Sequence, residues 1–367
     1  MAKAKTKNAR WSILICTVLL LAIGLTALYS ATISSELVEF KKQIIWLALS
    51  MPIFLCAYFI DYRVIAKIAL PLYIISIVLL ALVLLTGAIN GASSWFSLGS
   101  FSLQPGEFSK ITVILYLAVI MDKISRKSSK AINKPLNLLK VLAIAALPIL
   151  LIAMEPDYGT AMAYILALVM MLFVSGINKK YIFAAIILVI VLVPTLYFFV
   201  LPEHAKDRIN VYLNPYTDPR GAGYNIIQSK LAIGAGRLLG QGYLKGPQTH
   251  LGFLYPKSTD FIFSVIGEEF GFIVCAVTVI IYITLIVLSI SVAKTAEDDL
   301  GSYLAIGLTG ILLFHILENI GMTIGLLPIT GVPLPFISYG GSALITDMAI
   351  IGLILNVSDR YRRSIFQ

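Results

Sequence analysis

The sequence is poor in charge, cysteine and histidine. Only 13% of its 367 residues are charged, whereas a soluble domain carries about 25%, so an ordinary soluble enzyme is excluded. The few cysteines lie inside apolar runs, which indicates small buried residues rather than a disulfide framework or a metal site. The few histidines are too far apart in sequence for a zinc cluster. These residues are Cys16, Cys56, Cys275, His204, His250 and His315.

Long apolar runs take the place of that charge, and 59% of the residues are hydrophobic. Each run is about long enough to cross a bilayer as a helix. The first is too long for a signal peptide and has no small-residue cleavage site before Ser30, so we expect it to remain. We predict an all-α polytopic membrane protein with one membrane domain over residues 1–367. The ten predicted spans are 11–33, 41–60, 65–86, 107–121, 138–154, 159–175, 181–200, 261–292, 301–326 and 338–357.

The basic residues predict that both ends of the chain are cytoplasmic, because positive charge gathers in the loops on that side. With the amino terminus inside, 18 of the 28 basic residues fall on the inner side, and the short outer loops at 34–40, 155–158 and 327–337 contain none. The inner set is Lys3, Lys5, Lys7, Arg10, Arg63, Lys67, Lys123, Arg126, Lys127, Lys130, Lys134, Lys140, Lys179, Lys180, Lys294, Arg360, Arg362 and Arg363.

Two outer segments are polar. Residues 87–106 form a Gly- and Ser-rich loop, and residues 201–260 form a long extracytoplasmic loop without obvious strands or helices. Such a loop is uncommon unless it is functional. Its excess of positive charge suits either an anionic ligand such as a phosphate or an ordinary solvated surface. Its stretch GAGRLLGQG (234–242) could offer backbone N–H groups to phosphate, although no strand precedes it as in a nucleotide-binding fingerprint.

The stretch YPKSTDFIFSVIGEEF (255–270) places carboxylates at the edge of an apolar run and inside it. By spacing, Asp260, Ser258 or Thr259 caps the eighth span, and a capping carboxylate at a water-facing mouth remains available for chemistry. Glu268 and Glu269 would lie roughly 12 Å further along a straight helix. Adjacent residues cannot share one helix face, so at least one needs a partner in the bundle or a wet cavity. A structural ion pair and a functional site are both open.

Two further motifs bring charge to the same outer level. In QPGEFSK (104–110), Pro105 suits the first turn of a helix, and Glu107 and Lys110 share a face and can pair. In EPDYGTA (155–161), Asp157 is placed to cap the sixth span. Each feature alone fits a cap or a stabilising pair. Together with Asp260, they form four charged groups at one membrane level, which indicates a shared site.

Polar residues also lie within the last two spans, at His315, Glu318, Asn319 and Asp347. Helix–helix hydrogen bonding is the favoured interpretation for Asn319. A proton path through the membrane is the alternative.

Over nearly its whole length the chain resembles the SEDS family (shape, elongation, division and sporulation). QPGEFSK resembles the family's QPSE-x-x-K, EPDYGTA its PDLGTA, and STDFIFSVIGEEFGF its TDFIF-x-x-x-x-EE-x-G. GLLPITGVPLPFISYGGSA resembles its last outer loop, and the GVPLPF part looks like the elongation branch.

The resemblance implies a peptidoglycan glycosyltransferase that polymerises lipid II, an undecaprenyl-diphosphate-linked disaccharide pentapeptide, on the outer face of the bacterial plasma membrane. It places the essential carboxylate at Asp260, supporting polar residues at Glu107, Lys110 and Asp157, and a loop tryptophan at Trp95. It also implies a class B penicillin-binding protein, which is a transpeptidase, and elongation-complex membrane proteins as partners, and no nucleic acid.

The residues suit that chemistry. A sugar diphosphate already has a good leaving group, whereas the acceptor hydroxyl needs a base, so one carboxylate can support an inverting transfer that gives a β-1,4 glycan. We expect Asp260 to be the base. Lys110, with loop arginines or a divalent cation such as Mg²⁺ or Mn²⁺, would stabilise the departing diphosphate. Glu107 and Asp157 would position Lys110 or the cation.

Two other functions are open. A lipid II flippase or another transporter would need polar groups along a path through the membrane. A non-catalytic scaffold for a transpeptidase would not need Asp260. The residues that could serve a transporter are Glu268, Glu269, Glu318 and Asp347.

Overall fold

The structure is a computed structural model that describes residues 2–85, 96–98, 101–128, 130–199, 206, 212–219 and 221–363. A helix occupies each of the ten predicted spans. Six helices in the described part are long and apolar enough to cross a membrane, and α4 and α7 are shorter apolar helices. The predicted all-α multi-pass membrane architecture is confirmed. The helices are α1 (Ala2–Thr32), α2 (Val38–Phe59), α4 (Ala69–Val83), α5 (Pro105–Ser125), α6 (Pro135–Met154), α7 (Tyr158–Val174), α8 (Lys179–Phe199), α12 (Ile262–Lys294), α13 (Asp299–Thr323) and α14 (Gly341–Arg363).

Short elements connect these helices. α3 (Tyr62–Lys67) precedes α4, and 3-10 turns lie at Ile33–Ser35 and Ala131–Asn133. A small antiparallel hairpin, β1 (Phe96–Leu98) with β2 (Phe101–Leu103), lies inside the polar segment 87–106. The segment 201–260, predicted to lack secondary structure, contains a 3-10 turn (Pro215–Thr217), α10 (Ala222–Gly236) and α11 (Pro247–His250), so that expectation is wrong.

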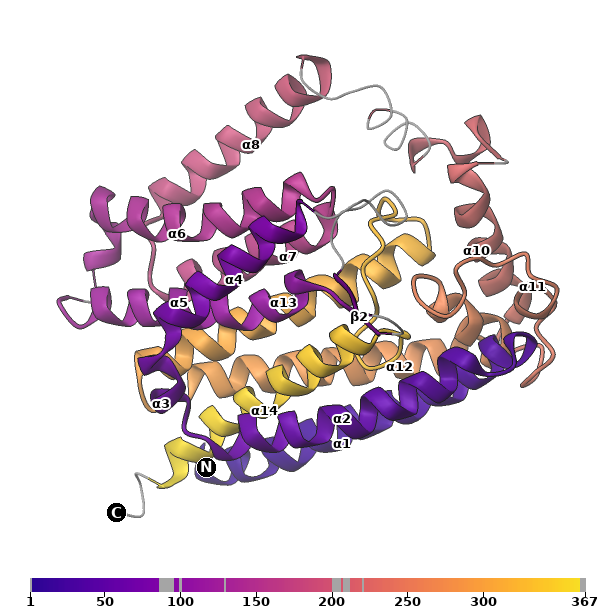
Figure 1. The fold of residues 1–367 in the computed structure, drawn as a ribbon, viewed down its shortest axis with the longest axis horizontal. Helices are drawn as coiled ribbons and strands as arrows, with labels where there is room; N and C mark the ends of the chain where they lie inside the picture. Colours follow the sequence, from indigo (N-terminus) through magenta and orange to yellow (C-terminus); the bar gives the residue numbers. More distant parts are fainter. Residues whose placement is uncertain are drawn as a thin grey trace.

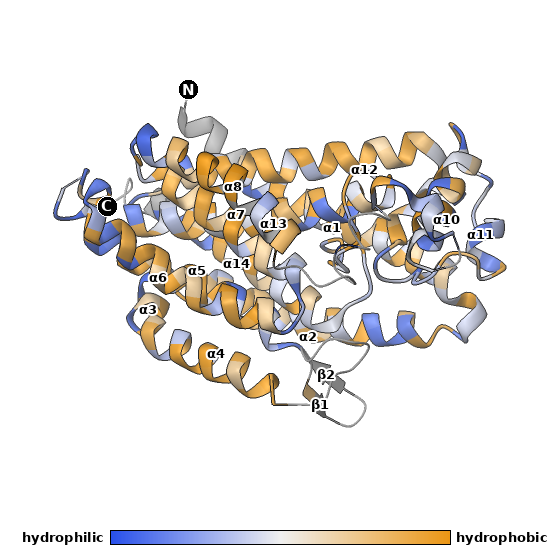
Figure 2. Cartoon of the chain, turned by 90° about the horizontal axis from the view of Figure 1, so that it is seen from above, coloured by the Kyte–Doolittle hydropathy of each residue, from blue (hydrophilic) through white to orange (hydrophobic). Residues whose placement is uncertain are grey.

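The two ends of the chain lie at the same end of the bundle, while α10 and α11 lie at the opposite end (Figure 1). Apolar residues cover most of the length of the helices, and polar residues gather at their ends and turns (Figure 2). This arrangement follows from the alternation of apolar runs and polar turns in the sequence. It matches the predicted placement of both termini on one side.

The centre of the bundle is formed by α13 and α14, of whose most apolar windows 78% and 89% are buried, against 17% for α2. Small residues allow this close packing. A Cβ added at Gly310 of α13 would lie 2.7 Å from the Ala167 backbone of α7, and one at Gly352 of α14 would lie 2.8 Å from the Phe54 carbonyl of α2. The helix that carries Glu318 and Asn319 is therefore held on several sides.

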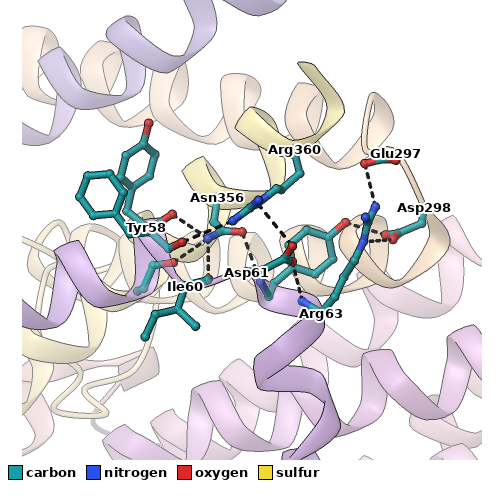
Figure 3. Close-up of polar contacts among 11 residues, drawn as sticks. Tyr58, Ile60, Asp61, Arg63, Glu297, Asp298, Asn356 and Arg360 are labelled. Atoms are coloured by element: carbon teal, nitrogen blue, oxygen red, sulfur yellow. Dashed lines mark hydrogen bonds and ion pairs between the residues drawn. The ribbon is translucent and has the colours of Figure 1, made fainter. Parts of the chain in front are cut away.

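A polar network ties the elements together at the end that holds the termini (Figure 3). The Asn356 amide of α14 donates to the carbonyls of Ala57, Tyr58 and Ile60 at 3.2, 2.6 and 2.7 Å, where α2 ends. Ion pairs surround it, namely Arg10–Asp359 (2.9 Å), Arg360–Asp61 (3.6 Å), Arg63–Glu297 (2.7 Å) and Arg63–Asp298 (2.9 Å).

The eighth span is broken rather than straight. Gly271 has φ 76° and ψ −175°, which separates a short buried helical segment (262–270) from the longer part that ends at Lys294. Only glycine adopts this conformation readily. Glu268 and Glu269 lie before this break, in the helical segment that begins at Ile262, so they continue the helix that follows Asp260, as expected, and the helix breaks only after them.

The glycine-rich stretch 234–242 pairs with this break. The N–H groups of Gln241 and Gly242 donate to the carbonyls of Glu268 and Glu269, at 2.8 and 3.1 Å. In return, the N–H of Phe272 donates to the Arg237 carbonyl, at 2.8 Å. These two N–H groups of the glycine-rich stretch serve the fold and are not offered to a phosphate.

Candidate functional site

The backbone of the segment Ser258–Thr259–Asp260 is attached to the C-terminal end of α13 and to the loop 324–340 that follows it. Its three successive carbonyl oxygens each accept a hydrogen bond from that region. The bonds are Tyr339 N–H to the Ser258 carbonyl (2.9 Å), Ser338 hydroxyl to the Thr259 carbonyl (2.6 Å) and Asn319 amide to the Asp260 carbonyl (3.0 Å). The segment is therefore fixed through its backbone, which leaves its side chains free for other contacts.

The Asp260 carboxylate does not cap α12. The N-cap is Phe261, and no side chain caps the first turn, so the predicted cap by Asp260, Ser258 or Thr259 is wrong. The carboxylate hydrogen-bonds with the Thr259 side chain, and its Oδ2 faces Gly331, where an added Cβ would lie 3.6 Å away. Burial raises the pKa of the Asp260 carboxyl above its ordinary value of 3.8, and the Thr259 bond opposes this rise. Asp260 is thus a half-buried carboxylate that has no ion-pair partner among the described residues and that is more basic than an exposed aspartate.

Asp157 caps α7, as predicted. Its Oδ1 accepts from the Thr160 N–H at 3.0 Å, and its Oδ2 accepts from the Gln104 amide at 3.0 Å, which joins the start of α7 to the start of α5. Two residues further on, a Cβ added at Gly159 would lie 3.1 Å from the Thr330 side chain. The motif that contains Asp157 therefore contacts the same loop as Asp260.

The predicted pair of Glu107 and Lys110 forms, but in the interior. Lys110 Nζ donates to Glu107 Oε1 at 2.6 Å, and the Lys110 and Glu107 side chains are 1% and 3% exposed. His315 Nε2 lies 3.0 Å from the same ammonium, so it must be the acceptor, because lysine only donates. A diphosphate could reach Lys110 only if this buried group opened. The position therefore contradicts the expectation that Lys110 meets the leaving group directly.

The four acids that could have served a transport path bond mainly to the segment 201–260 and to the loop 324–340. Glu268 accepts from the N–H groups of Gln248 and Thr249, at 2.7 and 3.0 Å, and so caps α11. Glu318 accepts from the Thr330 hydroxyl, at 2.9 Å. The other two bonds of this kind are Glu269 with His250 (3.0 Å) and Asp347 with the Phe336 N–H. Glu269 also accepts from Ser30 of α1, at 2.5 Å.

Sequence reasoning missed Glu155, which stands beside Asp157 in the turn between α6 and α7. Its side chain is 0% exposed, and neither carboxyl oxygen has a hydrogen-bond partner among the described residues. Burial, and then the neighbouring Asp157, raise the pKa of the Glu155 carboxyl to about 8. An acid at the end of an apolar run was the available signal.

The expected divalent cation finds no ready ligand set in the described part of the chain, where no three His, Cys, Asp or Glu side chains are arranged to hold a metal ion. Both Asp157 oxygens accept protein hydrogen bonds, and Glu107 is paired with Lys110. Trp95 lies outside the described residues.

Comparison with known proteins agrees with the motifs. The family model of the FtsW, RodA and SpoVE cell cycle proteins matches residues 10–363. The peptidoglycan glycosyltransferase MrdB of Escherichia coli K12 is 38% identical over 348 residues, which are 94% of this chain and 92% of that protein. The peptidoglycan glycosyltransferase RodA of Treponema pallidum is 31% identical over 424 residues, covering 95% of this chain and 97% of its own.

Solved structures share the fold. A chain from a structure titled for the coordination of polymerization and crosslinking by a peptidoglycan synthase complex matches with a TM-score of 0.83 and 28% identity, over 96% of this chain and 98% of that one. The crystal structure of the Thermus thermophilus rod shape determining protein RodA matches with a TM-score of 0.69 and 26% identity, over 95% and 96%. The chain therefore belongs to the FtsW/RodA/SpoVE family of cell cycle proteins, the SEDS family whose motifs it carries.

Proposed function

We propose that the chain is a peptidoglycan glycosyltransferase of the elongation branch, which polymerises lipid II into β-1,4 glycan on the outer face of the bacterial plasma membrane. The observation that carries the proposal is the Asp260 carboxylate, which is half-buried, free of any ion pair among the described residues, and held in place through its backbone. The relatives named above as peptidoglycan glycosyltransferases support the reaction class.

Asp260 is the general base of the proposed reaction. Its carboxylate takes the proton of the acceptor sugar hydroxyl while that oxygen attacks the anomeric carbon of the donor. The bond from this carbon to the diphosphate breaks, and the diphosphate leaves with the electron pair. Attack from the face opposite an α-linked leaving group gives a β-linkage in one inversion, without a covalent enzyme intermediate. The raised pKa of Asp260 makes it a better proton acceptor than an exposed aspartate.

The other site residues hold the site together in this proposal. Asp157 joins the starts of α5 and α7 through Gln104, and Glu107 with Lys110 fills the interior beneath them. Lys110 therefore acts on the substrate only through the position of its neighbours. Trp95, one residue before β1, is proposed as a substrate contact on the strength of the resemblance alone.

A transport path has little support in the structure. Glu268, Glu269, Glu318 and Asp347 each accept a hydrogen bond from an outer loop or turn. Acids that fix loops in this way are a structural use of buried charge, because each has a donor that offsets part of its desolvation. The polymerase and the scaffold remain as contrasting functions, and Asp260 separates them.

We further propose a transpeptidase of the class B penicillin-binding protein type as partner, within an elongation complex. The matched synthase structure is titled for coordinated polymerization and crosslinking, and an elongating strand needs both activities. The distribution of basic residues supports cytoplasmic ends and an outward-facing site.

The test is glycan synthesis from purified lipid II by the wild-type chain and by Asp260→Asn, each with the cognate penicillin-binding protein present and its transpeptidase blocked. We expect polymer from the wild type and none from the variant. Asp299→Asn is the matched control, because this exposed acid lies at the start of α13, at the inner end of the bundle, and it should polymerise normally. Equal polymer from wild type and folded Asp260→Asn would favour the scaffold.

A further inference from the structure

One side chain bridges the two chain segments that surround the Asp260 carboxylate. The amide nitrogen of Asn319, on α13, donates to the Asp260 carbonyl at 3.0 Å and to the Val332 carbonyl at 2.9 Å. Val332 follows Gly331, the residue against which Asp260 Oδ2 lies. Both hydrogens of the amide are thus used, one on each segment.

The chemistry of this bridge is specific to an amide. Both acceptors are carbonyl oxygens, so the nitrogen and not the oxygen of Asn319 must face them. The side chain is 0% exposed, and its Oδ1 has no hydrogen-bond partner among the described residues. Leaving a buried acceptor unpaired costs about 1–3 kcal/mol. The Asn319 oxygen thus stays unpaired, while the Asn319 nitrogen donates to the Asp260 and Val332 carbonyls.

A general helix–helix bond, the interpretation favoured by the sequence, does not describe the contact. The acceptors lie in the segment before α12 and in the loop after α13, and neither belongs to a spanning helix. What the amide fixes is the distance between Asp260 and the loop that covers its carboxylate.

We propose that Asn319 is the positioning residue of Asp260, acting by holding the Asp260 and Val332 carbonyls on one amide nitrogen. This inference rests on the proposed role of Asp260 as the general base. Without the bridge, the bonds from Tyr339 and Ser338 still hold the Ser258 and Thr259 carbonyls, but the Asp260 carbonyl is no longer tied to Val332. The carboxylate then loses part of its fixed direction toward the acceptor hydroxyl. Misplacement of a reacting group by about 1 Å can lower a rate by about 100-fold.

The chain supplies a matched control in Asn356. This asparagine is also buried, with 1% exposure, and its amide nitrogen also donates to backbone carbonyls of another element. It lies at the inner end of the bundle, among the residues in Figure 3, far along α14 from the outer loops. Replacing either amide removes similar bonds, but only one of the two sites is next to Asp260.

The experiment compares Asn319→Asp with Asn356→Asp, because a carboxylate has the same shape as the amide but repels the carbonyl oxygens. Melting temperature and the kinetics of lipid II polymerisation are measured for both, together with Asp260→Asn. We expect both substitutions to lower the melting temperature. Only Asn319→Asp should lower kcat, by about 100-fold, with KM for lipid II within about twofold of wild type.

A milder pair, Asn319→Ser and Asn356→Ser, serves if the carboxylate variants do not fold, because it removes donors without adding charge. An unchanged kcat in a folded Asn319 variant, or equal losses of kcat at the two asparagines, would overturn the positioning role. If Asp260→Asn is inactive while Asn319→Asp keeps a normal kcat, the positioning role alone is wrong. If Asp260→Asn is fully active, the proposed base itself is wrong.

Discussion

The ammonium nitrogen of Lys110 lies between two acceptors, 2.6 Å from Glu107 Oε1 and 3.0 Å from His315 Nε2, in a part of the bundle that water does not reach. Removing one partner of a buried ion pair leaves an uncompensated charge, which costs about 3–5 kcal/mol. Removing both partners costs much less. If Lys110 and Glu107 are mainly a structural ion pair, replacing both should therefore cost less stability than replacing either one alone. A lysine that mainly binds phosphate would not show this dependence on Glu107.

We therefore predict that Lys110→Met and Glu107→Gln each lower the melting temperature strongly, and that the double variant recovers more than half of the loss. Thermal unfolding of the four proteins in detergent measures the coupling. Ser109→Ala is a suitable control, because it removes a buried hydrogen bond with Tyr164, at the residue directly before Lys110, without creating an unpaired charge. Additive losses in the double variant would show that the two charges do not depend on each other.

The rate of polymerisation should fall at acid pH because of Asp260. A base works only when it is deprotonated, and burial raises the pKa of Asp260 above 3.8, so the acid limb of kcat/KM should lie above that pH. The Thr259 hydrogen bond lowers the pKa. Thr259→Val should therefore move the limb to higher pH. A limb that stays in place in Thr259→Val would show that another group controls it.

The helices could be predicted from the sequence because crossing a bilayer is a local property. A run of apolar residues of sufficient length must satisfy its backbone within the run, and a helix does so. The cap at Asp157 and the pair of Glu107 with Lys110 are equally local, since each involves residues three positions apart. All of these predictions are confirmed.

The features that depend on distant segments could not be predicted. The helix break at Gly271 is stabilised by backbone hydrogen bonds with residues 237–242, which lie about thirty positions earlier in the sequence. Asn319, Ser338 and Tyr339 hold the backbone just before α12, whose N-cap is Phe261, and the Asp260 side chain does not cap the helix. Motif spacing describes one segment at a time, so it could bring charged residues to one level but could not say which are buried.

Glu155 should destabilise the protein increasingly as the pH rises. Burial raises the pKa of its carboxyl from 4.5 to about 8, so between these values the folded state holds a proton that the unfolded state has lost. The free energy of unfolding then falls with rising pH, by about 1.4 kcal/mol per unit for one full proton. Above the raised pKa, neither the folded nor the unfolded state binds a proton at Glu155, so the free energy of unfolding no longer changes with pH because of this residue.

Glu155→Gln removes this titration and keeps the shape. We expect its melting temperature to exceed that of the wild type by little near pH 5 and by more near pH 8, as measured by thermal unfolding across that range. Glu36→Gln, at the exposed turn after α1, removes the same charge and controls for the change in net charge. A difference between Glu155→Gln and the wild type that does not change with pH would mean that Glu155 is ionised throughout.

Gly271→Ala should disrupt the join between α12 and the glycine-rich stretch. Gly271 has φ 76°, where a Cβ is strained, and its added Cβ would lie 2.6 Å from the Leu238 carbonyl oxygen. Strain and overlap together should cost about 2–6 kcal/mol. Gly234→Ala is the matched control, because that glycine lies in α10 with no atom within 4 Å of an added Cβ. The control should gain up to about 1 kcal/mol in the free energy of unfolding, because alanine has less backbone entropy to lose on folding than glycine.

Melting temperatures that fall for Gly271→Ala and rise for Gly234→Ala would show that the break is required by the fold. A normal melting temperature in Gly271→Ala would mean that α12 can straighten.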